Sequence, residues 1–327
     1  MNRVVISLLK IATILFIWLA SMALTVAIVG SLLASHNSRA LDALWKNDLK
    51  CGKPFCTTEV QDLPVPIQKD GSYDPDVSLY CMDLVLRVYN QARGLEPQPP
   101  KDLTEVIRLQ DLENDPVFGI MWTYKSPDTG KKVAFVILRG TMDLREWAQD
   151  FTYSQESFVS KKATQQSAMG FLRGVHTPPS VHSGFLDAYN NFRGKLLKSI
   201  DSVKPDQIIV SGHSLGAGVA TIAALDLKTL GYDTYAYVIA SPRVGDNVLR
   251  ETVISSRLPL FRVVNSSDLV PTLPPPVAPR FSDPGNPFIY THCGELISFT
   301  DNWFSYFNNH LPPVYLEFLR LKKTGGN

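Results

Sequence analysis

The feature that most constrains the fold of this chain is a strand-like run that leads directly into a turn framed by glycines. The run Gln207–Ser211 is rich in β-branched residues. It is followed by Gly212-His213-Ser214-Leu215-Gly216 and by apolar residues that continue as a helix to about Gly231. The glycines permit a sharp turn that a Cβ would obstruct. A strand, a tight turn and a helix in this order predict Ser214 as a nucleophile beside a helix N-terminus. The competing interpretation is a structural turn with a surface serine.

Strand-like and helix-like segments alternate along most of the chain. Residues 118–124 and 133–138 are β-rich, and the turn formers between them predict a β-hairpin. Helices are further expected over residues 76–93, 184–202 and 314–321, and strands over residues 235–240, 260–265 and 288–299. This alternation predicts an α/β fold with a mostly parallel central sheet and helices on both faces. The antiparallel hairpin is expected toward one edge.

The composition excludes several classes of protein. The chain has 327 residues, of which 45% are hydrophobic and 19% are charged, so it is a folded protein with a sizeable core. Its formal net charge of +1 gives no general attraction for phosphate backbones, and no Lys- or Arg-rich run supplies one locally. A nucleic-acid partner is therefore not expected, and the composition does not fix an oligomeric state.

An uncharged apolar segment, Ile11–Ala34, lies near the N-terminus. As a helix rising about 1.5 Å per residue, it exceeds the roughly 30 Å hydrocarbon core of a bilayer. Arg3 and Lys10 precede it, which favours a cytoplasmic N-terminus and the rest of the chain on the outer or lumenal side. The sequence predicts an uncleaved membrane anchor. The alternative is a cleaved signal and a secreted protein, because Ser38-Arg39-Ala40 has the form of a cleavage site.

These patterns divide the chain into three parts. Residues 1–34 form the anchor or signal segment. Residues 35–75 are polar and rich in turn formers, so they are expected to be a linker. Residues 76–327 form the folded domain.

The four cysteines are Cys51, Cys56, Cys81 and Cys293. An exported domain can oxidise its cysteines, and Cys51 with Cys56 is the weakly favoured pair because the two lie close together in a polar stretch. Cys81 falls on the apolar face of the helix over residues 76–93, which predicts a free thiol in the core. No CxxC or HxxxH spacing accompanies the cysteines, so no zinc site is expected.

A serine hydroxyl becomes a nucleophile when a histidine that is oriented by a carboxylate takes its proton. After a nucleophile in a strand–turn–helix, the acid and then the histidine are expected to follow in the chain. Asp268 is the favoured acid, because it follows the strand over residues 260–265 and such strand ends face the ligand crevice. Asp246 is the alternative. His310 is the favoured base because it lies in a loop, whereas His292 falls inside an alternating strand.

The negative oxygen of a tetrahedral intermediate needs two hydrogen-bond donors. One is expected from the backbone N–H of Leu215, directly after the candidate nucleophile. The other is expected after an earlier strand. Leu138-Arg139-Gly140-Thr141 ends the strand over residues 133–138, and Thr141 offers a backbone N–H and a hydroxyl. The competing interpretation of Thr141 is an ordinary turn at a strand end.

Together these motifs resemble the class 3 lipases, the fungal-lipase-like branch of the α/β-hydrolases, over most of residues 76–320. The motifs that carry the resemblance are Leu138–Thr141, Val181–Phe185, Gly212–Gly216, Ser241–Asp246, Arg262–Asn265 with Asp268–Pro271, Tyr290–Glu295, and His310 with Tyr315 behind it. Several motifs in one order are far more specific than any one of them alone.

The resemblance implies an α/β-hydrolase fold and hydrolysis of carboxylic esters, among them triacylglycerols, phospholipids and galactolipids, without a metal or other cofactor. The residues that it assigns to the site are the triad Ser214, Asp268 and His310 and the oxyanion-hole residues Thr141 and Leu215. It also assigns His292 to a structural strand motif, in agreement with the choice of base made from the residues.

A lid over the site is a further implication of the resemblance, because in the family the segment after the oxyanion loop covers the site. Here Leu144, Trp147 and Phe151 recur at helical spacing on one face. Asp143 and Glu146 have the spacing of a capping box that could start such a helix. The competing interpretation is a short core helix with the same apolar stripe.

Three functions are open at this stage. A lipid-directed ester hydrolase, acting at a lipid surface, is favoured. A hydrolase of small soluble esters or thioesters would use the same residues, and a membrane-anchored scaffold would need none of them. The intact set of serine, acid and histidine argues against the scaffold. Reaction with a fluorophosphonate probe would distinguish an enzyme from a scaffold. A comparison of the hydrolysis of short-chain and long-chain esters would distinguish the two hydrolases.

Overall fold

The computed structural model describes residues 63–92, 100–110, 117–141, 153–159, 178–302 and 308–323. The predicted anchor, the Cys51–Cys56 pair and the lid residues Leu144, Trp147 and Phe151 lie outside these ranges. Among the described helices, none is long and apolar enough to cross a bilayer. The anchor and the lid therefore stay predictions.

A seven-stranded sheet forms the centre of the described domain, with its strands in the order β1, β2, β3, β6, β7, β8 and β11. Their bounds are Thr104–Leu109, Gly119–Lys125, Lys132–Leu138, Gln207–His213, Thr234–Ile239, Leu260–Asn265 and Glu295–Phe299. The pairings among β1, β2 and β3 are antiparallel, and every pairing from β3 to β11 is parallel. The predicted sheet, with an antiparallel hairpin toward one edge, is confirmed, and β1 is an additional edge strand.

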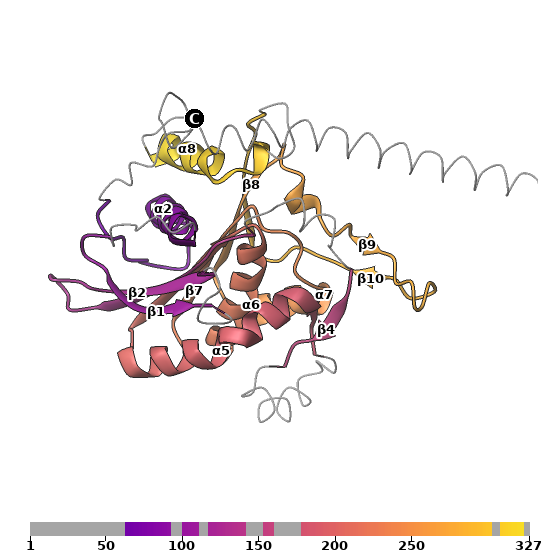
Figure 1. Ribbon diagram of the computed structural model, residues 1–327, viewed down its shortest axis with the longest axis horizontal. Helices are drawn as coiled ribbons and strands as arrows, with labels where there is room; N and C mark the ends of the chain where they lie inside the picture. The colour runs from indigo at the N-terminus through magenta and orange to yellow at the C-terminus, as the bar shows by residue number, and fades with distance from the viewer. Residues whose placement is uncertain are drawn as a thin grey trace, which may run out of the picture. The chain divides into compact units, whose positions relative to one another are not determined.

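Helices cover both faces of this sheet (Figure 1). Their bounds are Pro75–Ala92 for α2 and Pro312–Lys323 for α8 on one face, and Ser183–Val203 for α5 and Leu215–Thr229 for α6 on the other. Successive residues of β3 alternate between the two faces. Phe135 and Ile137 pack with α2, whereas Val136 packs with α5 and α6. Because both faces are covered, β3 is apolar at nearly every position.

The extended residues before α2 belong to the domain. Alternate apolar side chains of residues 63–67 pack against the core on the α2 face. Gln68 exchanges two hydrogen bonds with Gln207 at the start of β6, at 3.2 and 3.1 Å. The sequence assigns residues 35–75 to a linker because they are polar and rich in turn formers. The described part of that stretch is instead packed on the sheet, so the domain begins before residue 76.

The strand predicted over residues 288–299 is divided in two. Its parts are β10 (Phe288–Ile289), which pairs with β9 (Val277–Ala278), and β11, which joins the central sheet. Between them Gly294 has a φ of +88°, and a Cβ there would come closer than 3.0 Å to Leu260. His292 therefore lies in a connection and not inside a strand. The prediction was wrong because the alternation of apolar residues continues across the turn.

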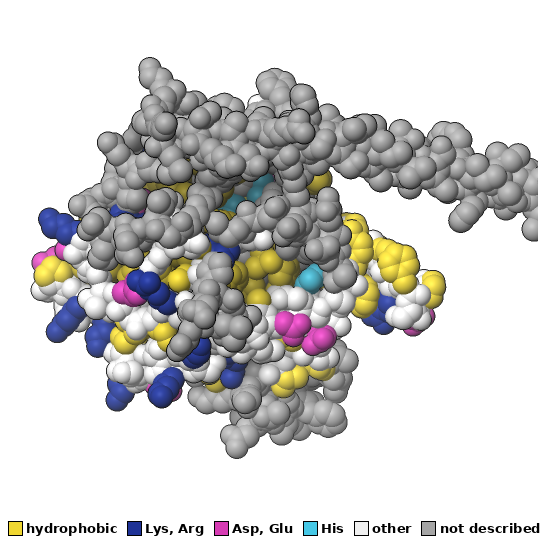
Figure 2. Space-filling model, viewed as in Figure 1, with side chains coloured by type: hydrophobic (Ala, Val, Ile, Leu, Met, Phe, Trp, Pro, Cys, Tyr) yellow, Lys and Arg dark blue, Asp and Glu magenta, His cyan; other side chains and the backbone are white. Residues whose placement is uncertain are grey.

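β9 and β10 form an arm, residues 277–289, that projects from the body of the domain (Figure 1). Phe281, between the two strands, is 89% exposed, and Figure 2 shows hydrophobic side chains gathered over the arm. Arg243 holds the root of the arm, because its guanidinium donates to the carbonyls of residues 272 and 274. The arm is thus an ordered element that presents apolar side chains at its surface.

The remaining described elements are small. They are the two-stranded pair β4 (Gln155–Ser157) and β5 (Ser180–His182), the helix α7 (Asn247–Ser255), and the 3₁₀ helices η2 (Val270–Thr272) and η3 (Asn308–His310). The sequence patterns did not predict β4, β5 or α7.

Cys81 and Cys293 are free, buried thiols. Burial raises the pKa of Cys81 to about 12 and that of Cys293 to about 11. The prediction of a free core thiol at Cys81 is confirmed, and neither thiol is ionised at neutral pH.

Candidate active site

The turn between β6 and α6 holds Ser214 in a strained conformation. Ser214 has a φ of 59° and a ψ of −127°, a region that side-chain-bearing residues seldom adopt and that costs about 1–3 kcal/mol. A Cβ on Gly212 would come closer than 3.0 Å to the backbone of Gly216, and a Cβ on Gly216 would do so to the carbonyl of Arg139. The predicted strand, glycine-framed turn and helix are present, and they hold the serine at the carboxyl end of β6.

Asp268 and His310 form a buried pair in which Asp268 Oδ2 lies 2.7 Å from His310 Nδ1. The backbone N–H of Val270 donates to Asp268 Oδ1 (2.9 Å), and the Tyr315 hydroxyl donates to Oδ2 (2.6 Å). Because a carboxylate only accepts hydrogen bonds, Nδ1 of the neutral imidazole carries the hydrogen and Nε2 carries the lone pair. This tautomer is the one that a general base requires.

A second set of contacts fixes the segment that carries His310. The Tyr315 hydroxyl accepts a hydrogen bond from the backbone N–H of Asn265 at the end of β8 (3.1 Å). Asn265 Nδ2 in turn donates to the carbonyl of Asn309 in η3 (3.2 Å). Burial, and then the charge of Asp268, hold the pKa of Tyr315 well above its usual range, so the hydroxyl stays protonated. Hydrogen bonds to Asn265 therefore hold both Tyr315, which contacts Asp268, and the segment of His310 at the end of β8.

Two buried atoms of this cluster have no hydrogen-bond partner among the described residues, namely Ser214 Oγ and His310 Nε2. Buried polar atoms are nearly always satisfied, so such exceptions require an explanation. One of the two atoms belongs to a hydroxyl and the other carries the lone pair of an imidazole, and a serine hydrolase passes a proton between two such atoms. Ser214 is fully buried, so a substrate reaches it only after neighbouring segments move.

The loop after β3 lies against the serine. A Cβ on Gly140 would come closer than 3.0 Å to Ser214 Cβ. Arg139 fixes this loop, because its Nε donates to the carbonyl of Val117 and its Nη1 donates to the carbonyl of Gly140, both at 2.7 Å. The loop therefore has little freedom to move away from the elbow.

Of the two predicted oxyanion-hole residues, Leu215 directly follows Ser214 and Thr141 directly follows Gly140, which lies against Ser214. Thr141 is half-buried and directly follows the loop residue that touches the serine. Leu215 is the first residue of α6, and the first N–H groups of an α-helix have no partner within the helix. The backbone at both positions is therefore next to the candidate nucleophile.

His213 makes contacts that the sequence patterns did not predict. Its Nδ1 lies 3.0 Å from the Tyr89 hydroxyl, and its Nε2 lies 3.0 Å from the carbonyl oxygen of His310. The Tyr89 hydroxyl also accepts the backbone N–H of Gly140 (2.8 Å). Tyr89 precedes His213 by 124 residues, and no local pattern relates the two positions.

The alternative acid and base have other partners. His292 Nε2 lies 2.8 Å from the carbonyl oxygen of Pro271. Burial, and then the charges of Arg262 and Arg243, lower the pKa of His292 to about 3. Asp246 accepts a backbone N–H at the start of α7 (2.9 Å) and so caps that helix. The structure therefore brings Asp268 and His310 together and gives the alternatives structural contacts.

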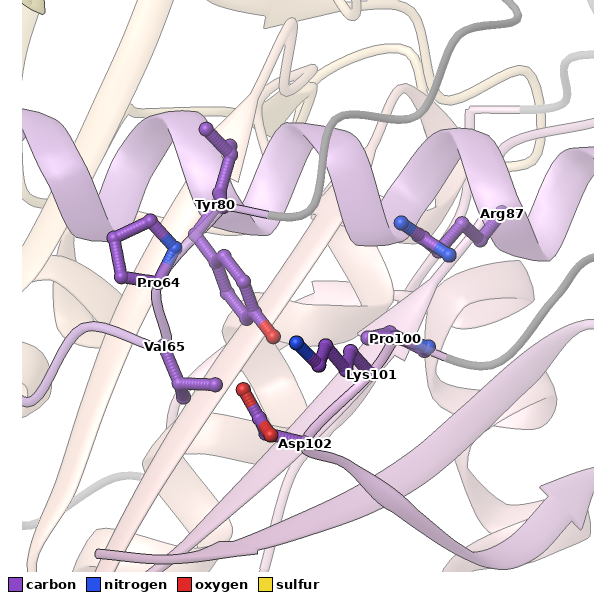
Figure 3. A pocket seen from close by; sticks show the side chains of 8 residues that line it. Pro64, Val65, Tyr80, Arg87, Pro100, Lys101 and Asp102 are labelled. Atoms are coloured by element: carbon purple, nitrogen blue, oxygen red, sulfur yellow. The ribbon is translucent and has the colours of Figure 1, made fainter.

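A separate cavity of about 200 Å³ lies beside α2 (Figure 3). Its lining residues are Leu63, Pro64, Val65, Tyr80, Arg87, Pro100, Lys101 and Asp102. The Tyr80 hydroxyl points toward Lys101 and Asp102 and has no hydrogen-bond partner among the described residues. The lining holds no pair of nucleophile and base. Within the described ranges, no three His, Cys, Asp or Glu side chains are arranged to hold a metal ion.

Comparisons with known proteins add sequence evidence. Residues 135–278 match the family model of class 3 lipases. A lipase of Rhizomucor miehei is 32% identical over 181 residues, which cover 53% of this chain and 43% of that protein. A secreted mono- and diacylglycerol lipase of Fusarium solani is 30% identical over 156 residues, which cover 46% of this chain and 42% of that protein. The chain thus matches less than half the length of each of these curated relatives.

A solved structure shares the fold. The lipase of Rhizomucor miehei in its propeptide complex superposes with a TM-score of 0.51 at 22% identity, and the match covers 80% of this chain and 90% of that chain. This likeness shows the α/β-hydrolase fold that the sequence predicts. The family match includes Thr141, Ser214 and Asp268 and ends before His310, so the evidence for His310 comes from its contact with Asp268.

Proposed function

We propose that this chain, whose residues 135–278 match the family model of class 3 lipases, is a serine hydrolase of that family and cleaves carboxylic esters of lipids. The observation that carries the proposal is the buried Asp268–His310 pair, whose His310 contacts His213, the residue directly before the strained Ser214. The pair orients the imidazole so that Nε2 can take a proton, and Ser214 supplies a hydroxyl at a helix N-terminus.

The first half-reaction forms an acyl-enzyme. Ser214 Oγ attacks the ester carbonyl carbon while its proton passes to His310 Nε2. The imidazolium keeps its Nδ1–H bond to Asp268, whose negative charge stabilises it. The tetrahedral intermediate then collapses, the bond to the alcohol oxygen breaks, and His310 returns the proton to that oxygen.

The oxygen of the intermediate carries a negative charge, which the backbone N–H groups of Thr141 and Leu215 would stabilise. In other serine hydrolases, the loss of one such donor lowers kcat by about 10²–10³-fold. In the second half-reaction His310 deprotonates a water molecule, which attacks the acyl carbon. The same two N–H groups would stabilise the second tetrahedral intermediate. His310 then returns the proton to Ser214 Oγ, and the product carboxylic acid leaves.

A lipid substrate, rather than a small soluble ester, is supported by the arm of residues 277–289. The arm follows the loop that carries Asp268, and Phe281 is 89% exposed on it. An aromatic side chain gains roughly 25 cal/mol per Å² when a lipid surface buries it. The names of the relatives, a lipase and a mono- and diacylglycerol lipase, support esters of glycerol.

Access to the buried serine is where the predicted lid would act. Leu144, Trp147 and Phe151 would cover the site in water and meet lipid when the segment opens. The predicted apolar segment Ile11–Ala34 would bring the enzyme to a membrane or export it as a cleaved signal. The relative from Fusarium solani is described as secreted, which supports the second of these two routes.

The proposal is tested by hydrolysis assays on dispersions of triacylglycerol, phospholipid and galactolipid and on a short soluble ester. The full chain should hydrolyse at least one dispersion, and Ser214→Ala should lower turnover at least about 10³-fold. Turnover of the short ester alone would support the small-ester hydrolase instead. Neither turnover nor labelling by a fluorophosphonate would support the scaffold.

A matched pair of surface variants separates lipid contact from chemistry. Phe281→Ala should lower kcat/KM on the active dispersion about 3- to 10-fold, because it removes apolar surface from the arm. The same variant should leave the short ester unaffected. Leu321→Ala, in α8, removes a side chain that is 53% exposed and should change neither activity. Equal losses on both substrates for Phe281→Ala would remove the support that the arm gives to a lipid substrate.

A further inference from the structure

Behind the triad, a continuous series of hydrogen bonds joins Gly140, Tyr89, His213 and His310. The direction of each bond follows from chemistry. The carbonyl of His310 only accepts, so His213 Nε2 carries the hydrogen and Nδ1 is an acceptor. The Tyr89 hydroxyl therefore donates to Nδ1, and its oxygen accepts the N–H of Gly140. Each donor in the series thus has one acceptor.

The series is closed to solvent. Tyr89 is 6% exposed and His213 is 1% exposed. The titratable groups that face His213 are Tyr89 from α2, His310 from η3 and Tyr315 from α8, with ring-centroid distances of 5.9, 4.7 and 5.9 Å. Burial, and then the proximity of His310, hold the pKa of His213 well below its usual range. His213 is therefore neutral, and it adds no positive charge beside His310 when that residue becomes an imidazolium.

Three members of the series lie at the three parts that the proposed reaction must align. Gly140 directly precedes Thr141, the oxyanion-loop residue. His213 directly precedes Ser214. The carbonyl that His213 binds belongs to His310 itself. These parts are the loop after β3, the turn after β6 and the helix η3, and α2 supplies the hydroxyl between two of them.

We propose that Tyr89 and His213 are positioning residues, which hold the oxyanion loop and the general base at fixed distances on either side of Ser214. This inference rests on the proposed function. The hydrogen bonds of the series go to backbone groups and between the two side chains, and none of them reaches Ser214 Oγ or His310 Nε2. Their effect on the rate is geometric, since a displacement of about 1 Å in a catalytic group can lower the rate about 10²-fold.

The first test is Tyr89→Phe with Tyr80→Phe as its matched control. Both tyrosines are buried residues of α2. The Tyr89 hydroxyl makes two hydrogen bonds of the series, whereas the Tyr80 hydroxyl has no partner among the described residues. On a short soluble ester, Tyr89→Phe should lower kcat about 10- to 100-fold and leave KM within about twofold. Tyr80→Phe should leave both constants within about twofold.

The second test separates the effects of the two hydrogen bonds of His213. His213→Gln can keep a donor near the position of Nε2, His213→Asn can keep an acceptor near the position of Nδ1, and His213→Ala keeps neither. Each amide variant should therefore retain more activity than His213→Ala. Completed labelling by a fluorophosphonate counts the intact sites, and the rate constant of labelling reports how well they are aligned. That rate constant should fall with kcat while the labelled fraction stays near that of the wild type.

Two results would overturn the inference. One is a Tyr89→Phe variant with the same kcat as Tyr80→Phe. The other is a loss of kcat that is matched by a loss of labelled sites at an unchanged rate constant, because the series would then only support the fold. Failure of the proposed function is distinct from both. In that case the wild-type chain would neither turn over the ester nor react with the probe.

Discussion

Two histidines follow Asp268 in the chain, and their surroundings carry opposite charges. His310 contacts the carboxylate of Asp268 at 2.7 Å. His292 contacts a backbone carbonyl and lies near the guanidinium groups of Arg262 and Arg243, which help to lower its pKa to about 3. A carboxylate stabilises the imidazolium that a general base becomes, and neighbouring cations oppose it. The charge around each histidine, more than its distance from Asp268 along the chain, determines which of the two can act as a base.

The two regions are nevertheless held by the same kind of contact. A buried tyrosine hydroxyl donates to Asp268 in one region, from Tyr315 (2.6 Å). In the other region the hydroxyl of Tyr290 donates to the carbonyl of Ser154 (2.8 Å). Both tyrosines are almost fully buried. Equal chemical changes in the two regions should therefore have similar effects on stability and different effects on activity.

The largest contrast is expected between the two histidines themselves. His310→Ala should lower kcat/KM on a short ester by about 10⁴-fold or more, because it removes the general base. His292→Ala should stay within about threefold of the wild type per folded molecule and should mainly lower the thermal midpoint. Steady-state kinetics with a parallel melting curve measures both. The reverse ranking in well-folded variants would mean that the base has been misassigned.

A smaller contrast is expected between the two tyrosines. Tyr315→Phe removes one hydrogen bond to Asp268 and leaves the N–H of Asn265 without its hydroxyl acceptor. It should lower kcat about 10-fold and cost about 1–3 kcal/mol of unfolding free energy. Tyr290→Phe should cost a similar amount of stability and leave kcat unchanged. Equal losses of kcat in the two variants would show that Tyr315 acts only through the fold.

The smallest effect concerns the stability of the protein in acid. The pKa of His292 is about 3 in the folded protein, below its ordinary value of 6.5. Below pH 6.5 the unfolded chain therefore binds a proton that the folded protein does not, and stability falls as the pH drops from 6.5 toward 3. His292→Asn should lose about 1 kcal/mol less unfolding free energy than the wild type between pH 7 and pH 5.5. Urea denaturation at the two pH values measures this difference. Equal losses of unfolding free energy in the variant and the wild type would contradict the lowered pKa of His292.

The elements that sequence patterns predicted well are those with local causes. Gly212 and Gly216 are required by close backbone contacts inside the elbow, so the motif and its strand–turn–helix appear in one short stretch. Asp268 and His310 lie 42 residues apart, and they were selected by their order, by the strand-end position of Asp268 and by the loop position of His310. The relation of Tyr89 to His213 has no such signal, because it depends on how α2 packs against the sheet.

The errors have physical causes as well. The prediction of an unbroken strand over residues 288–299 relied on alternation, which does not register the contact of Gly294 with Leu260. The assignment of residues 35–75 to a linker relied on turn formers, yet within it Gln68 is 2% exposed and is hydrogen-bonded to β6. In both places a tertiary contact decided the structure, and a tertiary contact leaves little trace in local composition.

The central claim is that Ser214 is activated by the His310–Asp268 pair, and peptide mapping after reaction with a fluorophosphonate tests it most directly. The full chain and His292→Ala should carry a single adduct on the peptide that contains Ser214. In His310→Ala the same adduct should form at least about 10³-fold more slowly. An adduct on another residue, or an unchanged rate of labelling in His310→Ala, would contradict the claim.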